Sequence, residues 1–237
     1  MIIMAWNCQG LGLDSAVDEL RDLIRSYNPA VVFLSETKKR ARAMDRLKWS
    51  LGFSKGVAVD CKGKSGGLAL WWRDQVEVTV RPWCQYYIDA AMVCDGVSFR
   101  FIGIYGEPCV KKRSKTWEVL RYLRAQDNLP WICADDFNEA LRQDEQQGGN
   151  PRSRVQMEVF EECLTDCGLA DLGFLGYRFT WDNKRDAGDN IQVRLDRATC
   201  NADFAQAFPA TEVLHVMTEE SDHRALVIKA LLTEGAV

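Results

Sequence analysis

The sequence lacks several features that would place the protein in a particular class. It has no run of about 18 apolar residues, so it predicts no membrane-spanning helix and no membrane partner. Its start, MIIMAWNCQG, lacks the basic flank and long apolar stretch of a signal peptide, so we expect a protein of the nucleus or cytosol that is not secreted. It also lacks a linker, a low-complexity tract and a short-period repeat. We therefore expect one domain over residues 1–237, present as a monomer.

An excess of positive charge is missing as well. The formal net charge of −4 argues against a protein that coats nucleic acid by bulk attraction, although it does not exclude local basic patches. The nine cysteines are odd in number and scattered, which favours a reducing compartment over a disulfide framework. Cys163 and Cys167 lie one helical turn apart, but no second pair of ligands is near them in the sequence. A zinc site there is therefore disfavoured.

Apolar runs and alternating segments predict a sheet-rich protein of the α/β (α+β) class. The pattern predicts strands at residues 1–7, 30–36, 55–60, 66–72, 76–80, 87–94, 98–106, 129–135, 178–181, 192–198, 211–217 and 223–232. It predicts helices at 14–28, 43–53, 115–125 and 154–169, with a helical turn near 202–207. Each half of the chain mixes strands and helices, which favours a compact domain with two sheets.

Polar side chains follow, or interrupt, several of these apolar strands. They are Asn7, Glu36, Tyr105, Asp136, Asn138, Asp196, Asp222 and His223. If the strands lie in neighbouring sheets, their ends converge on one rim, where loops build functional sites. An acid-rich cluster with few nitrogen ligands favours Mg²⁺ or Mn²⁺ over zinc. Asparagine amides and a histidine beside an aspartate complete the groups needed for metal-assisted hydrolysis of a phosphodiester.

Each of these residues also has a simpler explanation when it is considered alone. Asn7 is equally consistent with a turn residue, and Glu36 with a solvated strand end. Asp196 lies between two arginines and is consistent with a surface salt bridge. Trp181 is consistent with core or edge packing as well as with stacking on a substrate.

Seven segments, taken together and in order, resemble the endonuclease/exonuclease/phosphatase superfamily. They are WNCQGLG, LSETK, IYGEP, DDFNEAL, GYRFTWDN, RLDRA and SDHRAL, and they span residues 6–226. Within the superfamily the chain is most similar to the apurinic-like endonuclease domain of plant LINE-type retrotransposons, which also share GGLALWW and CGLADLGF. The resemblance implies a four-layer α/β sandwich, with two mixed sheets packed face to face and helices outside.

The same resemblance implies a function. The implied activity is a Mg²⁺-dependent (or Mn²⁺-dependent) DNA endonuclease that nicks one strand and leaves a 3′-hydroxyl and a 5′-phosphate. In a LINE element that 3′-hydroxyl primes reverse transcription, so a reverse transcriptase domain of a longer parent polyprotein is an expected partner. The alternative is a catalytically weakened or repurposed nuclease-like binding module.

The family motifs also assign a role to each candidate residue. Glu36 is the implied principal metal ligand, with Asn7 nearby and Asp222 completing the metal or histidine shell. Asp136 is implied to align or deprotonate the attacking water, and Asn138 to hold the phosphate. Asp196 is implied to pair with His223, which contacts the scissile phosphate, and Tyr105 belongs to a Y-x-x-P pattern of the apurinic and LINE branches.

One residue departs clearly from the family pattern. Asp135 stands where the family usually has glycine, as in G-D-F-N. Because successive strand side chains point to opposite faces, we expect Asp135 to point away from the face that carries Asp136. An aspartate at this place either crowds the site or captures a second cation. If it crowds the site, Asp135→Gly will raise the nicking rate.

Three basic runs are candidates for contacts with DNA phosphates. The first begins with Lys38, Lys39 and Arg40, the second is Cys61–Gly67, and the third begins with Lys111, Lys112 and Arg113. Each run adjoins one of the motifs, so we expect the runs to surround the site, with Trp181 as a further DNA contact. A solvated surface without a ligand is the alternative for each run.

Overall fold

Two large sheets form the centre of the computed structural model, which describes residues 1–186 and 188–232. The seven-stranded sheet contains, in spatial order, β11 (Leu175–Gly176), β15 (Glu212–Val216), β16 (Ala225–Lys229), β1 (Ile2–Asn7), β2 (Val31–Ser35), β4 (Leu68–Trp72) and β3 (Lys55–Val59). The six-stranded sheet contains β10 (Ala170–Asp171), β14 (Asp196–Cys200), β8 (Trp131–Asp136), β7 (Val97–Tyr105), β6 (Tyr87–Cys94) and β5 (Glu77–Trp83). A three-stranded sheet contains β12 (Trp181–Asp182), β13 (Gln192–Val193) and β9 (Gln146–Gln147).

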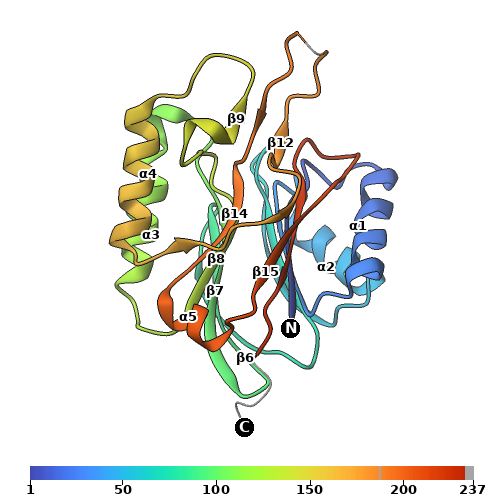
Figure 1. Cartoon of the computed structure of the whole chain (residues 1–237). Helices are drawn as coiled ribbons and strands as arrows, with labels where there is room; N and C mark the ends of the chain where they lie inside the picture. Colours follow the sequence, from blue (N-terminus) through green and yellow to red (C-terminus); the bar gives the residue numbers. More distant parts are fainter. Residues whose placement is uncertain (187, 233–237) are drawn as a thin grey trace.

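The helices lie around the two large sheets, the first four in chain order on the outer faces and the fifth at one end, where Phe204 joins the core between the sheets (Figure 1). They are α1 (Asp14–Tyr27), α2 (Ala41–Ser50), α3 (Ser114–Arg124), α4 (Arg154–Asp166) and α5 (Ala202–Ala207), with 3₁₀ turns η1 (Val110–Lys112) and η2 (Gln143–Glu145). Helices α1 and α2 pack on the seven-stranded sheet, and α3 and α4 pack on the six-stranded sheet. The predicted four-layer sandwich of two mixed sheets is therefore confirmed. Among the described residues, no helix is both long and apolar enough to cross a membrane.

The continuous apolar character of the central strands follows from burial on both faces. In β1, Ile3 and Ala5 join the core between the two sheets, whereas Met4 and Trp6 join the core beneath α1. The sheets approach so closely that a Cβ atom added at Gly103 would lie 2.2 Å from the ring of Phe33. A side chain at position 103 would therefore force the sheets apart.

Two parallel pairs of strands set the position of the site. Strand β1 runs parallel to β2, with Asn7 opposite Ser35. Strand β7 runs parallel to β8, with Tyr105 opposite Asp136. Because β1 lies against β8 and β2 lies against β7 across the sandwich, the carboxyl ends of all four strands meet at one edge.

The last third of the chain is less regular than the sequence predicts. The strand predicted at 192–198 is divided into β13 and β14, because the backbone leaves the small sheet after Val193 and joins the six-stranded sheet at Asp196. Between them, the amide of Arg194 bonds the Glu145 carbonyl and the carbonyl of Leu195 accepts from Phe137. Alternation alone does not reveal that a strand changes its partner sheet.

Candidate active site

Asp136, at the end of β8, lies at the centre of a hydrogen-bonded cluster. Its Oδ2 accepts from Nδ2 of Asn7 at 3.0 Å and from Nδ2 of Asn138 at 3.1 Å, and its Oδ1 accepts from the Asn138 amide at 2.8 Å. Burial raises the pKa of Asp136 to about 7, although the nearby His223 opposes that rise. A carboxylate with a pKa near neutrality is suited to accept a proton from water at physiological pH.

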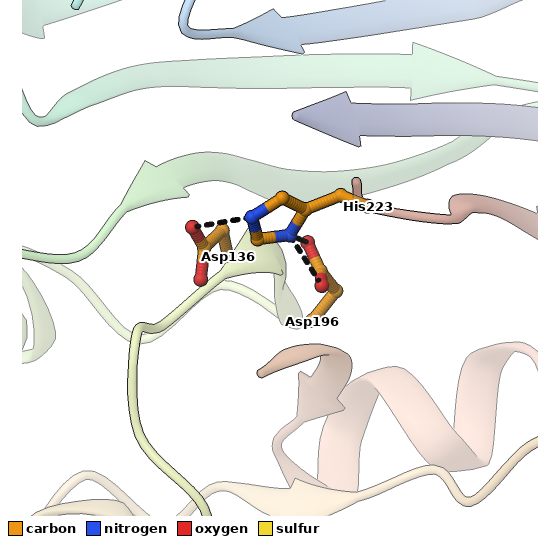
Figure 2. A group of neighbouring side chains, drawn as sticks. All are labelled: Asp136, Asp196 and His223. Carbon is orange, nitrogen blue, oxygen red and sulfur yellow. Dashed lines mark hydrogen bonds and ion pairs between the residues drawn. The ribbon is translucent and has the colours of Figure 1, made fainter. Parts of the chain in front are cut away.

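His223 is held by the buried carboxylate of Asp196, as Figure 2 shows. Its Nδ1 lies 2.9 and 3.1 Å from the two Asp196 oxygens, so that Nε2 faces Asp136 at 3.9 Å. Burial alone lowers the pKa of His223, but the carboxylates of Asp196 and Asp136 overcome this effect and raise it to about 10. The imidazole is therefore a cation at neutral pH and can donate from Nε2.

The backbone around His223 is fixed from both sides. The Ser221 hydroxyl accepts from the His223 amide at 3.0 Å and donates to the Asn7 carbonyl at 2.7 Å. The Trp6 indole donates to the His223 carbonyl at 3.2 Å. These bonds join the start of β16 to the end of β1, and Asn7 Nδ2 lies 3.4 Å from His223 Nε2 as a result.

Glu36 forms a second acidic position beside this cluster. The Tyr105 hydroxyl donates to its Oε1, and Lys38 Nζ lies 3.4 Å from its Oε2. Lys38 also donates to the backbone and side-chain oxygens of Gln9, at 2.9 and 2.7 Å. Burial, followed by the charges of Glu36 and Asp136, raises the pKa of Tyr105 above its ordinary value. The phenol therefore stays protonated and donates to Glu36.

Asp222 lies beside His223 at the edge of the same cluster. Its Oδ2 accepts from the Trp181 indole at 2.9 Å, and its Oδ1 lies 4.0 Å from His223 Nε2. That Oδ1 is buried and has no hydrogen-bond partner among the described residues. Trp181, which the sequence analysis expects to contact DNA, thus holds an acidic residue of the site in place.

The donor set fits a divalent cation. The ligand atoms of Asp136, Asp196 and His223 lie within 4.8 Å of one another, but the protonated His223 is paired with Asp196, so the carboxylates of the site are the groups available to a cation. The unpartnered oxygen of Asp222 adds a further acceptor to this oxygen-rich group, which is the chemistry that Mg²⁺ and Mn²⁺ prefer. Glu36, which the resemblance makes the principal ligand, lies outside the group of three; it bonds Tyr105, which is paired with Asp136 on the neighbouring strand.

Asp135 does not point away from the site, so the expectation from strand alternation is wrong. Its φ angle of +111° interrupts the regular alternation, and its carboxyl accepts a hydrogen bond from Ser35 in the opposite sheet. The carboxyl is fully buried, with one oxygen lacking a partner among the described residues. Burial and the charges of Asp196 and Asp136 raise the pKa of Asp135 well above its ordinary value. It is therefore a buried contact between the two sheets, whose neutral form is favoured, rather than an exposed charge.

The residues of the basic runs differ in how far they are exposed to solvent. Lys39 is half-buried, and Arg40, Lys111 and Lys112 are exposed. Arg113 is buried, so the expected DNA contact of this residue is contradicted. Its guanidinium is paired with a buried glutamate and donates to two backbone carbonyls, which leaves it unavailable to a phosphate.

Sequence reasoning missed two residues of the site. Ser35 and Ser221 connect the elements that carry the acidic groups, and neither has an unusual composition or spacing around it. The available signal was their position inside two of the family-like segments, LSETK and SDHRAL.

A two-sheet sandwich with an aspartate–histidine pair and converging carboxylates at its edge defines a hydrolase of the nuclease and phosphatase class. The chain belongs to the Endonuclease/Exonuclease/phosphatase family, whose model matches residues 4–223. This is a superfamily of phosphodiester hydrolases, and the predicted family membership is confirmed. A search of curated proteins gives no match.

Several solved structures share the fold at low sequence identity. The endonuclease domain of TRAS1, a telomere-specific non-LTR retrotransposon, superimposes with a TM-score of 0.73 at 17% identity, covering 98% of this chain and 99% of that one. The AP endonuclease LMAP from Leishmania major gives a TM-score of 0.73 at 16% identity, covering 96% and 86%. The 3′-5′ exonuclease NExo from Neisseria meningitidis gives 0.69 at 19% identity, covering 97% and 99%.

Proposed function

We propose that this protein is a divalent-metal-dependent DNA endonuclease that nicks one strand and leaves a 3′-hydroxyl and a 5′-phosphate. The observation that carries the proposal is the convergence of Asn7, Asp136, Asn138, Asp196 and His223 at one edge of the sandwich, beside the Glu36–Tyr105 pair. Retrotransposon and AP endonucleases among the structural neighbours favour DNA over other phosphodiesters as the substrate.

Each residue of the cluster has a chemical task in this proposal. Asp136 orients the attacking water and takes its proton, since its pKa of about 7 allows both protonation states near neutrality. The imidazolium of His223 donates from Nε2 to a phosphate oxygen, where negative charge develops. Asn138, which is fixed by Asp136 and by the Gly106 carbonyl at 2.8 Å, holds a second phosphate oxygen. Asp196 keeps the imidazole charged and oriented.

The metal would be held by Glu36 together with Asp222 and the carboxylate of Asp136, and Asn7 would fix that carboxylate through its amide. When it is bound, such a cation neutralises charge on the phosphate and lowers the pKa of a bound water. Mg²⁺ is the proposed ion because the ligands are predominantly carboxylate oxygens.

The biological setting belongs to the same proposal. A nick with a free 3′-hydroxyl is the primer that a LINE-type reverse transcriptase requires, so we propose action on nuclear DNA in concert with such a domain. Lys39, Arg40, Lys111 and Lys112 are the proposed contacts with the DNA backbone. Trp181, which donates a hydrogen bond to Asp222, is also a proposed contact with the DNA strand.

A plasmid assay tests the activity. Supercoiled plasmid is incubated with the protein and Mg²⁺, and open circles are quantified against Glu36→Gln, with Glu118→Gln on the exposed face of α3 as a matched control. We expect conversion by the wild type and the control but not by Glu36→Gln, and we expect DNA ligase to reseal the nicks. Conversion at the same rate by Glu36→Gln would reject the proposal, and so would nicks that ligase cannot seal.

The alternative of a nuclease-like binding module makes a different prediction for metal binding. Calorimetric titration with Mg²⁺ should give a signal that Glu36→Gln weakens. A protein that binds DNA but shows neither Mg²⁺ binding nor nicking would be such a module.

A further inference from the structure

Two adjoining hollows extend from the candidate site along the side of the sandwich. The first, of about 160 Å³, is lined by Tyr105 at one end and by Lys62 and Gln85 farther out. The second, of about 540 Å³, shares Lys62, Gln85 and Tyr86 with the first and ends at Trp83. We call the two together the lateral groove. It lies between the loop Cys61–Gly67 and the turn Trp83–Tyr86.

Backbone hydrogen bonds fix both walls of the lateral groove to the candidate site. In one wall, the amides of Thr37 and Lys38, the two residues that follow Glu36 in the chain, donate to the carbonyls of Gly67 and Gly66 at 3.1 and 2.9 Å. In the other wall, the amide of Tyr105 donates to the carbonyl of Tyr86 at 2.7 Å. A DNA strand whose scissile phosphate lies at the candidate site can therefore place its neighbouring nucleotides in this groove.

The side chains in the groove match those that hold single-stranded nucleic acid. Trp83 is 52% exposed, although exposing an indole to water is unfavourable, and it stands at the far end of the groove. Lys62 and Lys64 are exposed on the opposite loop, and neither forms an ion pair among the described residues. An aromatic face with lysines across a groove is the combination that stacks a base and neutralises its phosphates.

The two acidic residues of the groove are already occupied. Asp60 Oδ1 accepts from the amide of Ala41 at 2.7 Å. Glu107 accepts from the Tyr86 hydroxyl at 2.9 Å and from the amide of Cys109 at 3.1 Å. Both carboxylates keep their negative charge, since these donors are neutral, but their bonds hold them to the protein while Lys62 and Lys64 are exposed and can meet a phosphate.

We propose that the lateral groove binds the DNA strand next to the scissile phosphate and that Trp83 stacks on an unpaired base of that strand. This inference rests on the proposed endonuclease function and adds a preference to it. A base offers its face to an indole only when it leaves the duplex stack, which is easiest where it is unpaired. The protein therefore prefers target sites with unpaired bases beside the nick.

Binding measurements without divalent cation test the groove separately from catalysis. A fluorescent duplex with a short unpaired stretch and a fully paired duplex of the same length are titrated with wild type, Trp83→Ala and Trp83→Phe. Trp49→Ala is the matched control, since Trp49 is 63% exposed on α2, away from the groove. We expect Trp83→Ala to weaken binding of the unpaired substrate by roughly 5- to 100-fold and to leave the paired duplex unchanged.

Two further variants and a photocrosslink test whether Trp83 itself contacts the unpaired base. Trp83→Phe should retain most of the preference and Trp49→Ala all of it, and 5-iododeoxyuridine at the unpaired position should photocrosslink to the wild type but not to Trp83→Ala. Equal binding of the unpaired substrate by wild type and Trp83→Ala would overturn the groove while leaving the endonuclease proposal intact. Failure of the wild type to bind either DNA would reject the endonuclease proposal and the groove with it.

Discussion

Replacing the buried Asp135 by glycine should stabilise the protein, and the gain should increase with pH. The residue has a φ of +111°, a conformation that costs an ordinary side chain about 1–2 kcal/mol and glycine almost nothing. The substitution also removes a buried carboxyl whose second oxygen has no partner among the described residues. Against these gains stands the loss of the hydrogen bond from Ser35, worth about 1 kcal/mol.

The pH dependence follows from the proton that Asp135 holds. Its pKa is raised well above the ordinary value by burial and neighbouring carboxylates, so the native protein keeps a proton that the unfolded chain releases above pH ~4. The contribution of this residue to stability is therefore complete below pH ~4 and is lost as the pH rises toward the folded pKa, by about 1.4 kcal/mol per pH unit. The glycine variant has no such loss, so its advantage over the wild type should grow as the pH rises from about 4 toward the folded pKa of Asp135.

Urea unfolding at several pH values, without added divalent cation, measures both effects. The matched control is Asp95→Gly, because Asp95 also has a positive φ, +51°, but is exposed in the turn between β6 and β7. We expect its stability change to be the same at every pH. A gain for Asp135→Gly that stays constant from pH 5 to 8 would refute the protonated, buried carboxyl. A loss of stability at all pH values would show that the contact with Ser35 outweighs the backbone strain.

Three further predictions concern catalysis, metal binding and stability. The nicking rate on an oligonucleotide duplex should rise as Asp136 ionises, at a pH no higher than about 7 because a bound cation favours the carboxylate, and fall above about pH 10 as His223 loses its proton; a rate that keeps rising beyond pH 10 would argue against the imidazolium. Lys38→Met should tighten Mg²⁺ binding by up to about 5-fold in calorimetry, because the ammonium 3.4 Å from Glu36 competes with the metal, and weaker binding would contradict this. Arg197→Met should lower the free energy of unfolding by about 3–5 kcal/mol in urea, since it removes one of the two arginine partners of the buried Glu145 and the partly buried Asp171, and a loss below about 1 kcal/mol would contradict a structural role.

Much of the fold was predictable because the central strands carry their own signal. Segments such as VVFLS of β2 and WICADD of β8 are buried on both faces, so they appear as continuous apolar runs that end in acidic residues. The small sheet was not predictable, since its strands contain two residues each and have no period to detect.

The candidate site was predictable as a set of residues but not as a geometry. Strand ends located Asn7, Asp136 and His223, whereas the mutual contacts depend on how two sheets face each other. The direction in which the Asp135 side chain points could not be inferred, because a positive φ at a non-glycine residue follows from tertiary contacts rather than from local sequence. The burial of Arg113 could not be inferred either, because a basic run does not reveal which of its residues pairs with a buried acid.

The pairing of Asn7 with Asp136 and of Ser221 with the Asn7 carbonyl joins the beginning, middle and end of the chain. No fragment that ends before residue 223 contains the imidazole, and no fragment that lacks β1 contains the Asn7 amide that donates to Asp136. The site is therefore incomplete until the segment that carries His223 has folded against β1. Two inactive pieces, divided in an exposed loop, should recover cleavage only upon reassociation, which offers a route to a nuclease that is switched on by bringing its halves together.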